Sequence, residues 1–562
     1  MKQKKSTNFS KKNNKKIDLI SIIILIAPFM VGVMPLWSAY LLSLICLIGL
    51  IYQVIKKKKI ILPKGKNIIF VLIYLVSFLI VDFYAIDKGM NMLAFFKNLS
   101  ILIFLLLYLQ YDYDEEKQKK IFSYIPYSGA ISVVFSLILS ALSIIDIFWD
   151  NRLQGIFFYA NTYGIFLLIG VLITILKEKL QGKDFIVSTI LALGIIFTNS
   201  RAIILLLFFV LLVGCIMNKK NRKQLISVSL SIIFLFGSIY LFSNMENRIT
   251  TEMFSSSEFI TRLLYYKDAI EMIKENPFGY GYEGWYYKQV EIQTGVYDTK
   301  FVHNSILQVI LDVGIIPALA LMILLVGTFF DKKQSVQNRL ILLILLGHSL
   351  IDIDLEYLYF ILLIVMIIDF EKFEVKKNNL MVVSSTILTL CYFVLFLSTL
   401  CYEVGNYKNA YAIIPFYTEA LQAELYQTMD EKEQVELAEK IYLLNKNVSG
   451  VYQAFSNELR KENRYDEALN YEKKRLGLNK YNMMNYLDYT EFLIEALQYY
   501  FEQNDLEKVK QYKVEICDVE TKINETINNT NPLCYQTAHT PNLEIPNEMK
   551  AFTEEIKLEV ET

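Results

Sequence analysis

Histidine and metal-type cysteine motifs are scarce in this sequence. Only three of the 562 residues are histidine, and the six cysteines include no CxxC pair or other metal-binding spacing. Four of the cysteines lie in apolar runs, where a thiol packs as a small hydrophobic side chain. We therefore expect no metal site and no cofactor. Cys517 and Cys534, in the C-terminal part, could pair only if that part lies in an oxidising space.

Charged residues are also few. They make up 20% of the chain and hydrophobic residues 54%, which argues against a soluble protein and favours a membrane protein. The first 16 residues carry seven lysines and precede an apolar stretch from Ile17 to about Trp37. That stretch is too long for the hydrophobic part of a signal peptide and lacks a small-residue cleavage site. We predict a cytoplasmic basic N-terminus, 1–16, and a retained first span.

Thirteen apolar runs approach the roughly 20 residues that a helix needs to cross a bilayer. The sequence therefore predicts an all-α, multispanning transmembrane helical bundle with about 12–13 spans between residues 17 and 401. The runs lie near 17–37, 38–55, 67–86, 93–111, 122–146, 155–176, 184–200, 201–217, 224–243, 304–330, 339–351, 353–370 and 379–401.

Basic residues indicate the orientation of this bundle. If the N-terminus is cytoplasmic, the seven segments on that side hold 29 lysines and arginines, against three in the short loops opposite: Lys88, Arg152 and Arg201. The odd number of spans then places residues from about 402 onward outside the cytoplasm, with a large outer loop at 244–303. We predict a multi-pass protein of the plasma or inner membrane with an extracytoplasmic C-terminal domain.

The unusual polar residues of the apolar region fall on the outer side. Arg201 begins a predicted span, where the helix dipole disfavours a cation by up to about 1 kcal/mol, so another interaction should favour it there. An arginine that snorkels to the lipid headgroups is the alternative. The outer set comprises Arg152, Arg201, Arg248, Arg262, His303, His348 and Asp352.

His303 stands at the start of a predicted span, where the dipole opposes protonation, so a neutral imidazole could act there as a base. Asn304, Gln308 and Asp312 follow at four-residue spacing on one stripe of an apolar helix. A carboxylate in a span costs about 2.5–3.5 kcal/mol on insertion scales, so we expect Asp312 to face the bundle or a wet cleft. Pro317 is expected to kink the span. The alternative for His303 is an interfacial helix cap.

The chain after about residue 402 becomes amphipathic and repeats at an offset of 34, as in Leu444/Leu478, Tyr452/Tyr486 and Leu459/Leu493. That period is typical of tetratricopeptide (TPR) helix pairs. We predict an extracytoplasmic TPR-like α-helical domain at 402–518 and a loosely ordered tail, rich in Asn, Thr and Pro, at 519–562. The domain could dock an acceptor, a glycan chain or a partner protein, or only solubilise; removing it would then spare the chemistry.

The stretches around the outer polar residues follow a recognisable order. Arg152 leads RLQGIFFYANTYG, TNSRA contains Arg201, TRLLYYKDAIEMIKENP contains Arg262, NPFGYGYEGW comes next, His303 begins HNSILQVILDVGIIP, and HSLIDID closes the series. In this order they resemble the O-antigen ligase and polysaccharide polymerase superfamily, whose motif of His-Asn, nine residues and Gly is matched by His303 to Gly314. Pro317 departs from the family pattern. The resemblance covers roughly residues 20–400 and implies a GT-C-like fold for the region 17–401.

The resemblance also implies an activity: a metal-independent, inverting membrane glycosyltransferase of cell-envelope polysaccharide biosynthesis. Such an enzyme moves a glycan from a polyprenyl (undecaprenyl) diphosphate carrier to a hydroxyl of a glycan, lipid or protein acceptor. Its partners would be these molecules, membrane lipids and a possible protein bound by the TPR-like domain, but no nucleic acid. His303 would be catalytic. The diphosphate would be bound by Arg201, Arg262 and Arg152, because guanidinium groups stay charged and form bidentate hydrogen bonds with phosphates. Asn304, His348, Asp352 and Arg248 would support the site.

Alternatives remain open. A lipid-linked glycan transporter or flippase is the competing class, although such proteins commonly place charges near the midplane, whereas the polar residues here gather at one face. Both a ligase and a polymerase fit the sequence, since they share a donor and differ in acceptor. The aromatic segment GYGYEGWYYKQV, 279–290, could contact sugars or only the membrane interface.

Overall fold

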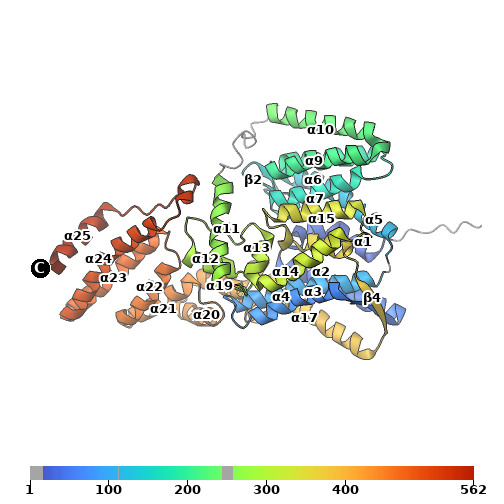
Figure 1. Cartoon of the computed structure of the whole chain (residues 1–562). Helices are drawn as coiled ribbons and strands as arrows, with labels where there is room; N and C mark the ends of the chain where they lie inside the picture. The colour runs from blue at the N-terminus through green and yellow to red at the C-terminus, as the bar shows by residue number, and fades with distance from the viewer. Residues whose placement is uncertain (1–16, 112, 243–256, 562) are drawn as a thin grey trace, which may run out of the picture.

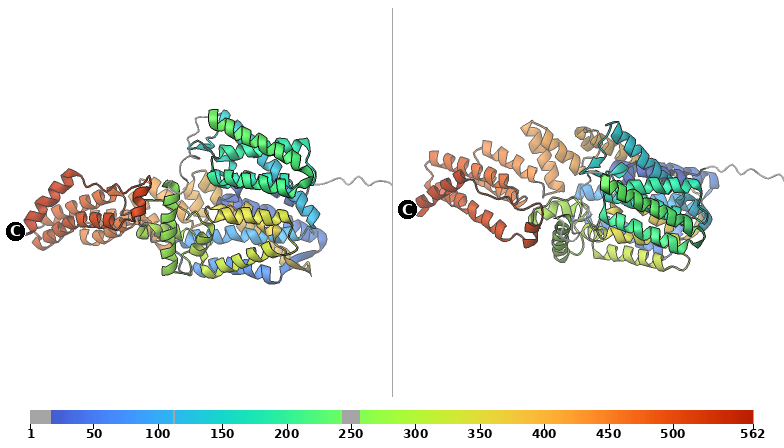
Figure 2. Two further views of the ribbon diagram at one scale, coloured as in Figure 1. Left: turned by 45° about the horizontal axis from the view of Figure 1, so that its top comes forward. Right: turned by 90° about the horizontal axis from the view of Figure 1, so that it is seen from above.

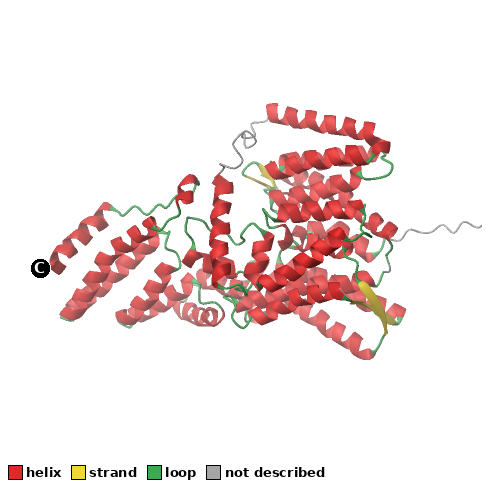
Figure 3. Ribbon diagram, viewed as in Figure 1, coloured by secondary structure: helices red, strands yellow, loops and turns green. Residues whose placement is uncertain are grey.

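The computed structural model describes residues 17–111, 113–242 and 257–561. Helices dominate the described chain, and its few strands form two small antiparallel pairs (Figures 1 and 3). The predicted all-α, multispanning fold is confirmed. One strand pair joins β1 (Lys59–Lys64) to β4 (Glu371–Lys376), and the other joins β2 (Phe148–Trp149) to β3 (Arg152–Leu153).

The bundle itself is built from two groups of helices. The first group is α1 (Leu19–Ile26), α2 (Leu36–Lys57), α3 (Lys66–Val81), α4 (Lys88–Leu109), α5 (Glu115–Phe122), α6 (Ile125–Ala141), α7 (Ala160–Ile175), α8 (Gly182–Phe197), α9 (Arg201–Met217) and α10 (Arg222–Phe242). The second group is α14 (Ile315–Phe330), α15 (Val336–Ser349), α16 (Leu358–Ile367) and α17 (Asn379–Glu403). Between them lie α11 (Ser257–Glu275), α12 (Gly284–Ile292) and α13 (Ser305–Val313).

Each of the thirteen predicted spans overlaps a helix, but few of these helices are long. Among the described residues, four helical stretches are long and apolar enough to cross a membrane: Leu36–Lys57, Lys88–Leu109, Glu115–Ala141 and Asn379–Glu403. A bent pair, Arg201–Met217 with Lys219–Ser238, makes a fifth, and five shorter apolar helices accompany them. The predicted 12–13 spans therefore exceed the helices that reach spanning length on their own.

Two predicted spans are interrupted, which corrects the sequence-based boundaries. The first, 17–37, contains the eight-residue helix α1, followed by two 3₁₀ turns through Val33. The second, 304–330, is divided at Gly314 into α13 and α14. Pro317 falls in the first turn of α14, where proline needs no helical hydrogen bond, so it does not kink the span as expected.

The break at Gly314 is held by the backbone of the NPFGYG stretch. The Tyr280 and Gly281 amides donate to the carbonyls of Leu311 and Asp312 (2.6 and 3.0 Å), and the Ile315 amide donates to Pro277 O (2.9 Å). Gly314 has φ +92°, and a Cβ there would lie 2.8 Å from the backbone of Phe278. Only glycine fits this crossing without strain. The crossing fixes where α13, and hence the chain that precedes it, lies against the bundle.

The two ends of the bundle differ in what closes them. At one end the β1–β4 pair joins two of the segments predicted to be cytoplasmic, 56–66 and 371–377. From the opposite end project α11, α12 and the C-terminal helices (Figures 1 and 2). The C-terminal helices are α18 (Tyr407–Ile413), α19 (Thr418–Gln427), α20 (Glu431–Leu444), α21 (Ser449–Lys461), α22 (Tyr465–Gly477), α23 (Met483–Glu502), α24 (Leu506–Asn528) and α25 (Asn547–Glu561).

The C-terminal helices dock on the bundle through buried polar contacts. The carboxylate of Asp87, the N-cap of α4, accepts hydrogen bonds from Thr418 Oγ1 (2.8 Å) and Asn445 Nδ2 (2.9 Å). Consecutive helices pack on one another, but the tetratricopeptide assignment stays a prediction. The expectation of a loosely ordered tail from residue 519 is wrong over two stretches, because α24 runs to Asn528 and α25 follows.

An ion cluster around the buried Glu283 adds a second contact between the loop region and the C-terminal helices. Lys300 Nζ lies 2.6 Å from a carboxylate oxygen of Glu283 and 2.6 Å from one of Glu419. Burial, with Glu419 nearby, raises the pKa of Glu283 to about 8 despite Lys300. The folded state therefore favours the protonated carboxyl of Glu283. The stabilisation that Glu283 contributes is complete when the pH lies below the ordinary pKa of a glutamate, and it is lost as the pH rises through about 8.

Gly314→Ala should destabilise the protein by about 1–3 kcal/mol, because alanine is strained at this φ and its Cβ overlaps Phe278. The measurement is the unfolding free energy in detergent. Gly327→Ala in α14 is the matched control, since a Cβ there meets nothing within 4 Å. Equal stabilities of the two variants would contradict the proposed crossing.

Glu283→Gln should flatten the pH dependence of thermal stability. The wild-type melting temperature should fall as the pH rises from about 5 to 8.5, whereas the glutamine variant, which cannot ionise, should lose less over that window. Glu439→Gln, at an exposed position of α20, should keep the wild-type profile. Identical slopes in all three proteins would show that Glu283 does not titrate in this range.

Candidate active site

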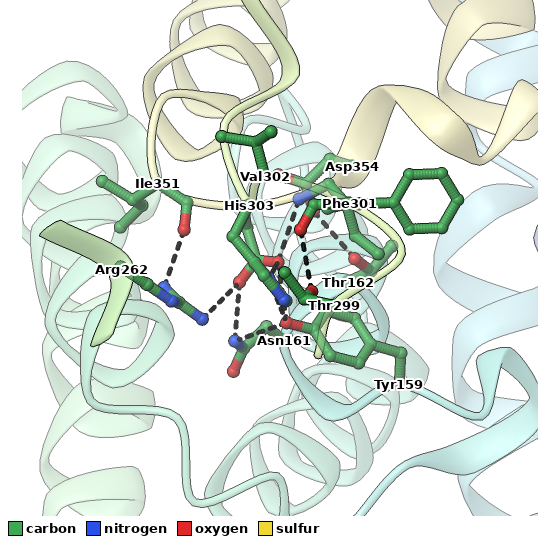
Figure 4. A network of polar contacts seen from close by, with 12 residues as sticks. Tyr159, Asn161, Thr162, Arg262, Thr299, Phe301, Val302, His303, Ile351 and Asp354 are labelled. Atoms are coloured by element: carbon green, nitrogen blue, oxygen red, sulfur yellow. Dashed lines mark hydrogen bonds and ion pairs between the residues drawn. The ribbon is translucent and has the colours of Figure 1, made fainter. Parts of the chain in front are cut away.

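A buried carboxylate, that of Asp352, lies at the centre of the polar residues predicted to form the site. Asp352 follows α15 in the turn before α16, outside the apolar helices, and is fully buried. Its carboxylate accepts hydrogen bonds from Tyr159 Oη (2.8 Å) and Asn161 Nδ2 (2.6 Å). Arg262 Nη2 and His303 Nδ1 each lie 3.5 Å from it (Figure 4). Three separate segments thus converge on one negative charge.

His303 is held in an uncommon backbone conformation. Its φ is +55°, in the left-handed region, and its carbonyl accepts a hydrogen bond from Tyr266 Oη (2.9 Å). The ring packs on that of Tyr265, with centroids 6.0 Å apart, and its side chain is 21% exposed. With Nδ1 directed at the Asp352 carboxylate, a hydrogen on Nδ1 leaves Nε2 as the basic nitrogen. Backbone strain of this kind gathers at functional sites.

Arg262 comes from α11, the helix that carries Tyr265 and Tyr266. One guanidinium nitrogen, Nη1, donates to Ile351 O at 2.7 Å, while Nη2 faces Asp352. Burial alone would raise the pKa of Asp352, yet Arg262 and His303 together hold it well below its usual range. The carboxylate is therefore ionised at neutral pH and pairs with the Arg262 guanidinium.

Arg152 reaches the same network through a hairpin and an amide. The hairpin β2–β3 turns at Asp150 and Asn151, both with positive φ, as in a type I′ turn. Arg152 Nε donates to Thr198 O (3.0 Å), and Nη2 donates to Asn161 Oδ1. Because Asn161 in turn donates to Asp352, Arg152 is linked to the central carboxylate by one side chain.

The remaining predicted residues divide as follows. Arg201 is the first residue of α9, three residues beyond the carbonyl that receives Arg152. Asn304 caps α13, with Oδ1 accepting from the Ile306 and Leu307 amides (3.0 Å each), and its Nδ2 donates to Leu350 O (2.8 Å). Arg248 lies outside the described residues.

His348, predicted with Asp352 to support the site, pairs with Asp354. Its Nδ1 lies 2.6 Å from Asp354 Oδ2, and Thr162 Oγ1 donates to the other oxygen of Asp354 (3.0 Å). The two aspartates, two residues apart, serve different histidines. The His348–Asp354 pair is buried beside the site and ties α15 to the start of α7.

Sequence reasoning missed several contributors and misjudged others. Tyr159 and Asn161 lie within the quoted stretch RLQGIFFYANTYG, which was the available signal for them. In the segment 279–290, Trp285 is fully buried and donates from Nε1 to Thr299 O (3.1 Å), so it packs the loop rather than a sugar. Cys517 and Cys534 are both free thiols. Across the described ranges, no three His, Cys, Asp or Glu side chains gather as a metal site would require.

Comparison with known families supports the resemblance drawn from the motifs. Residues 186–323 match the family model described as O-antigen ligase. This part of the chain is similar to O-antigen ligases. The match supports the O-antigen ligase and polymerase superfamily, and together with the apolar helices it indicates an integral protein of the inner membrane. No match was found among the curated proteins or the solved structures compared.

The O-antigen ligase match and the polar network overlap only in part. The matched residues run from α8 to α14 and include Arg201, Arg262 and His303. Asp352, Asn161 and Arg152 come from outside the match. The groups that orient His303 and Arg262 are therefore supplied by other parts of the fold, and the site is complete only in the folded chain.

Asp352→Asn should lower any turnover at this site by at least about 100-fold, because an amide neither fixes the His303 tautomer nor holds Arg262. Turnover of the purified variant is the measurement. Asp369→Asn, at an exposed position near β4 at the other end of the bundle, is the control and should match the wild type. Full turnover in the Asp352→Asn variant would remove the central carboxylate from the account.

Proposed function

We propose that the protein transfers a glycan from a polyprenyl-diphosphate carrier to an acceptor hydroxyl, as an O-antigen ligase or a surface polysaccharide polymerase. The observation that carries the proposal is the contact of Asp352 with both His303 and Arg262. A base and a permanent cation held by one buried carboxylate suit a reaction that deprotonates one oxygen while another oxygen leaves as an anion.

His303 is the proposed base. Its Nε2 takes the proton of the acceptor hydroxyl as the acceptor oxygen bonds to the anomeric carbon of the donor glycan. Asp352 keeps the hydrogen on Nδ1 and stabilises the imidazolium that forms. General-base catalysis of this kind contributes about 10²–10⁴-fold to rate.

The arginines are proposed to bind the leaving group, which is the lipid diphosphate. As the bond from the anomeric carbon to the phosphate oxygen breaks, the lipid diphosphate takes the electron pair and its charge grows. Arg262 uses part of its guanidinium on Ile351 and Asp352, which leaves other N–H groups for phosphate oxygens. Arg152, which is linked to Asp352 through Asn161, and Arg201, at the start of α9, are further candidates. Attack opposite the leaving phosphate inverts the anomeric centre, and no metal is needed in this scheme.

The orientation proposed from the basic loops places this chemistry at the outer leaflet. The helix α11, which carries Arg262, and α13, which begins just after His303, lie toward the end of the bundle from which the C-terminal helices project (Figure 1). Asp352 contacts both residues. Two of the basic segments, 56–66 and 371–377, pair at the β1–β4 end. The site would then bind the polyprenyl-diphosphate carrier on the outer side of the membrane, where envelope polysaccharides are assembled.

Transfer in detergent separates this function from transport. Purified protein, mixed with a polyprenyl-diphosphate-linked glycan and an acceptor, should form a new glycosidic bond without any membrane compartment. A lipid core acceptor tests ligase activity, and a second carrier-linked glycan tests polymerase activity. Movement of the glycan across liposomes with no product from any acceptor would favour a flippase instead.

His303→Ala should reduce transfer by at least about 100-fold while membrane insertion and thermal stability stay close to those of the wild type. Product formation from the lipid-linked donor is the measurement. His539→Ala is the matched control, since that histidine lies at an exposed position near the C-terminus. Wild-type turnover without the His303 imidazole would exclude it as the base.

A further inference from the structure

We propose that residues 531–538, here called the strap, are a positioning element for the loop that carries Arg262 and His303. The strap follows α24 and returns from the C-terminal helices to the side of α11. The proposal rests on the proposed function for its kinetic consequence, but the contacts that carry it are structural.

The strap bonds to both parts of this loop. The Asn531 amide donates to Thr294 O (2.7 Å), and Cys534 Sγ accepts from the Val296 amide (3.3 Å). Further along, the Ala538 amide donates to Ser257 Oγ at the start of α11 (2.6 Å). The eight residues of the strap thus join the beginning of α11, the helix that carries Arg262, to the turn after α12.

The strap also completes the hydrophobic core of the loop. Cys534 is fully buried in a cluster with Leu264, Tyr297 and Val302. Leu264 is two residues from Arg262, and Val302 precedes His303. Tyr297 packs edge-on against Tyr265 (4.8 Å), whose other neighbour is the His303 ring. Packed side chains therefore connect the strap to the His303 ring through Tyr297 and Tyr265, and to α11, the helix that carries Arg262, through Leu264.

Asp268 ties these pieces together. Its buried carboxylate accepts from the Thr294 amide (2.9 Å), Thr294 Oγ1 (2.9 Å) and Tyr297 Oη (2.6 Å). The segment 294–297 is therefore held by α11 on one side and by the strap on the other. Releasing the strap should free the outer side of this segment and loosen α11.

These contacts argue against a C-terminal region that only solubilises the protein or docks an acceptor. A cap with such a role has no need to bury a thiol in the core of the catalytic loop. The sequence-based expectation was that the region after residue 402 can be removed without loss of chemistry. On the strap proposal, its removal should instead impair the chemistry.

The test compares Cys534→Tyr with Cys534→Ser in the full chain. Tyrosine is too large for the space beside Gly295, where even a Cβ on Gly295 would lie 3.1 Å from Cys534 Sγ. We expect faster deuterium uptake by 257–275 and 294–297 and a kcat lowered by about tenfold or more with little change in KM, because small displacements of catalytic groups are costly. The serine variant should restore both. Cys391→Tyr, on the exposed side of α17, is the control.

A disulfide crosslink tests the same contact by fixing the strap in place instead of releasing it. The Cβ of a cysteine at 295 would lie 3.2 Å from Cys534 Cβ, close to the disulfide range of about 3.5–4.5 Å. Oxidised Gly295→Cys should keep wild-type kcat and protect α11 from exchange. A kcat that drops on oxidation and recovers on reduction would mean that the strap must open, and would overturn the proposal.

The outcomes separate this proposal from the proposed function. If wild-type protein transfers no glycan, the function fails, while deuterium uptake still decides whether the strap holds α11. If wild-type protein is active and Cys534→Tyr changes neither uptake nor kcat, the strap proposal fails and the function stands.

Discussion

The structure depends on one buried negative charge. The Asp352 carboxylate is fully buried and is stabilised by the groups that reach it, which include Tyr159, Asn161, Arg262, His303 and the Ile353 amide. An unpaired carboxylate in this position would cost several kcal/mol, so these segments must arrive together or the site does not form. The same constraint orients the imidazole and keeps a guanidinium beside it. Stability of the site and its readiness for chemistry therefore have one physical cause.

Bringing those segments together requires backbone contacts far from the carboxylate. The NPFGYG stretch crosses the chain at Gly314 and sets the position of α13, whose N-cap follows His303 directly. On the other side, the C-terminal helices dock on Asp87 and return through the strap to α11. The loop that bears Arg262 and His303 is thus held between the bundle and the C-terminal region. We attribute its precision to being fixed on both sides.

The helical membrane fold and His303 could be predicted from the sequence, whereas contacts between distant segments could not. Apolar runs gave the helical membrane fold, and the scarcity of histidine drew attention to His303. The division at Gly314 was missed because it depends on backbone partners in the distant stretch 277–281, which leave no periodic signal. The sequence could not assign the partners of His303 and His348, because Asp352 and Asp354 are only two residues apart and the fold directs each of them to a different histidine. Tyr159 and Asn161 were not singled out, since ordinary polar residues gain importance here only through contacts across the fold.

The most direct test of the central claim is a structure of the protein in lipid nanodiscs with a polyprenyl-diphosphate carrier bound. The account predicts that the diphosphate contacts the guanidinium of Arg262 at the end of the bundle that bears the C-terminal helices, with His303 facing the anomeric carbon from the side opposite the leaving oxygen. A diphosphate bound at the β1–β4 end, or out of reach of both Arg262 and His303, would contradict it.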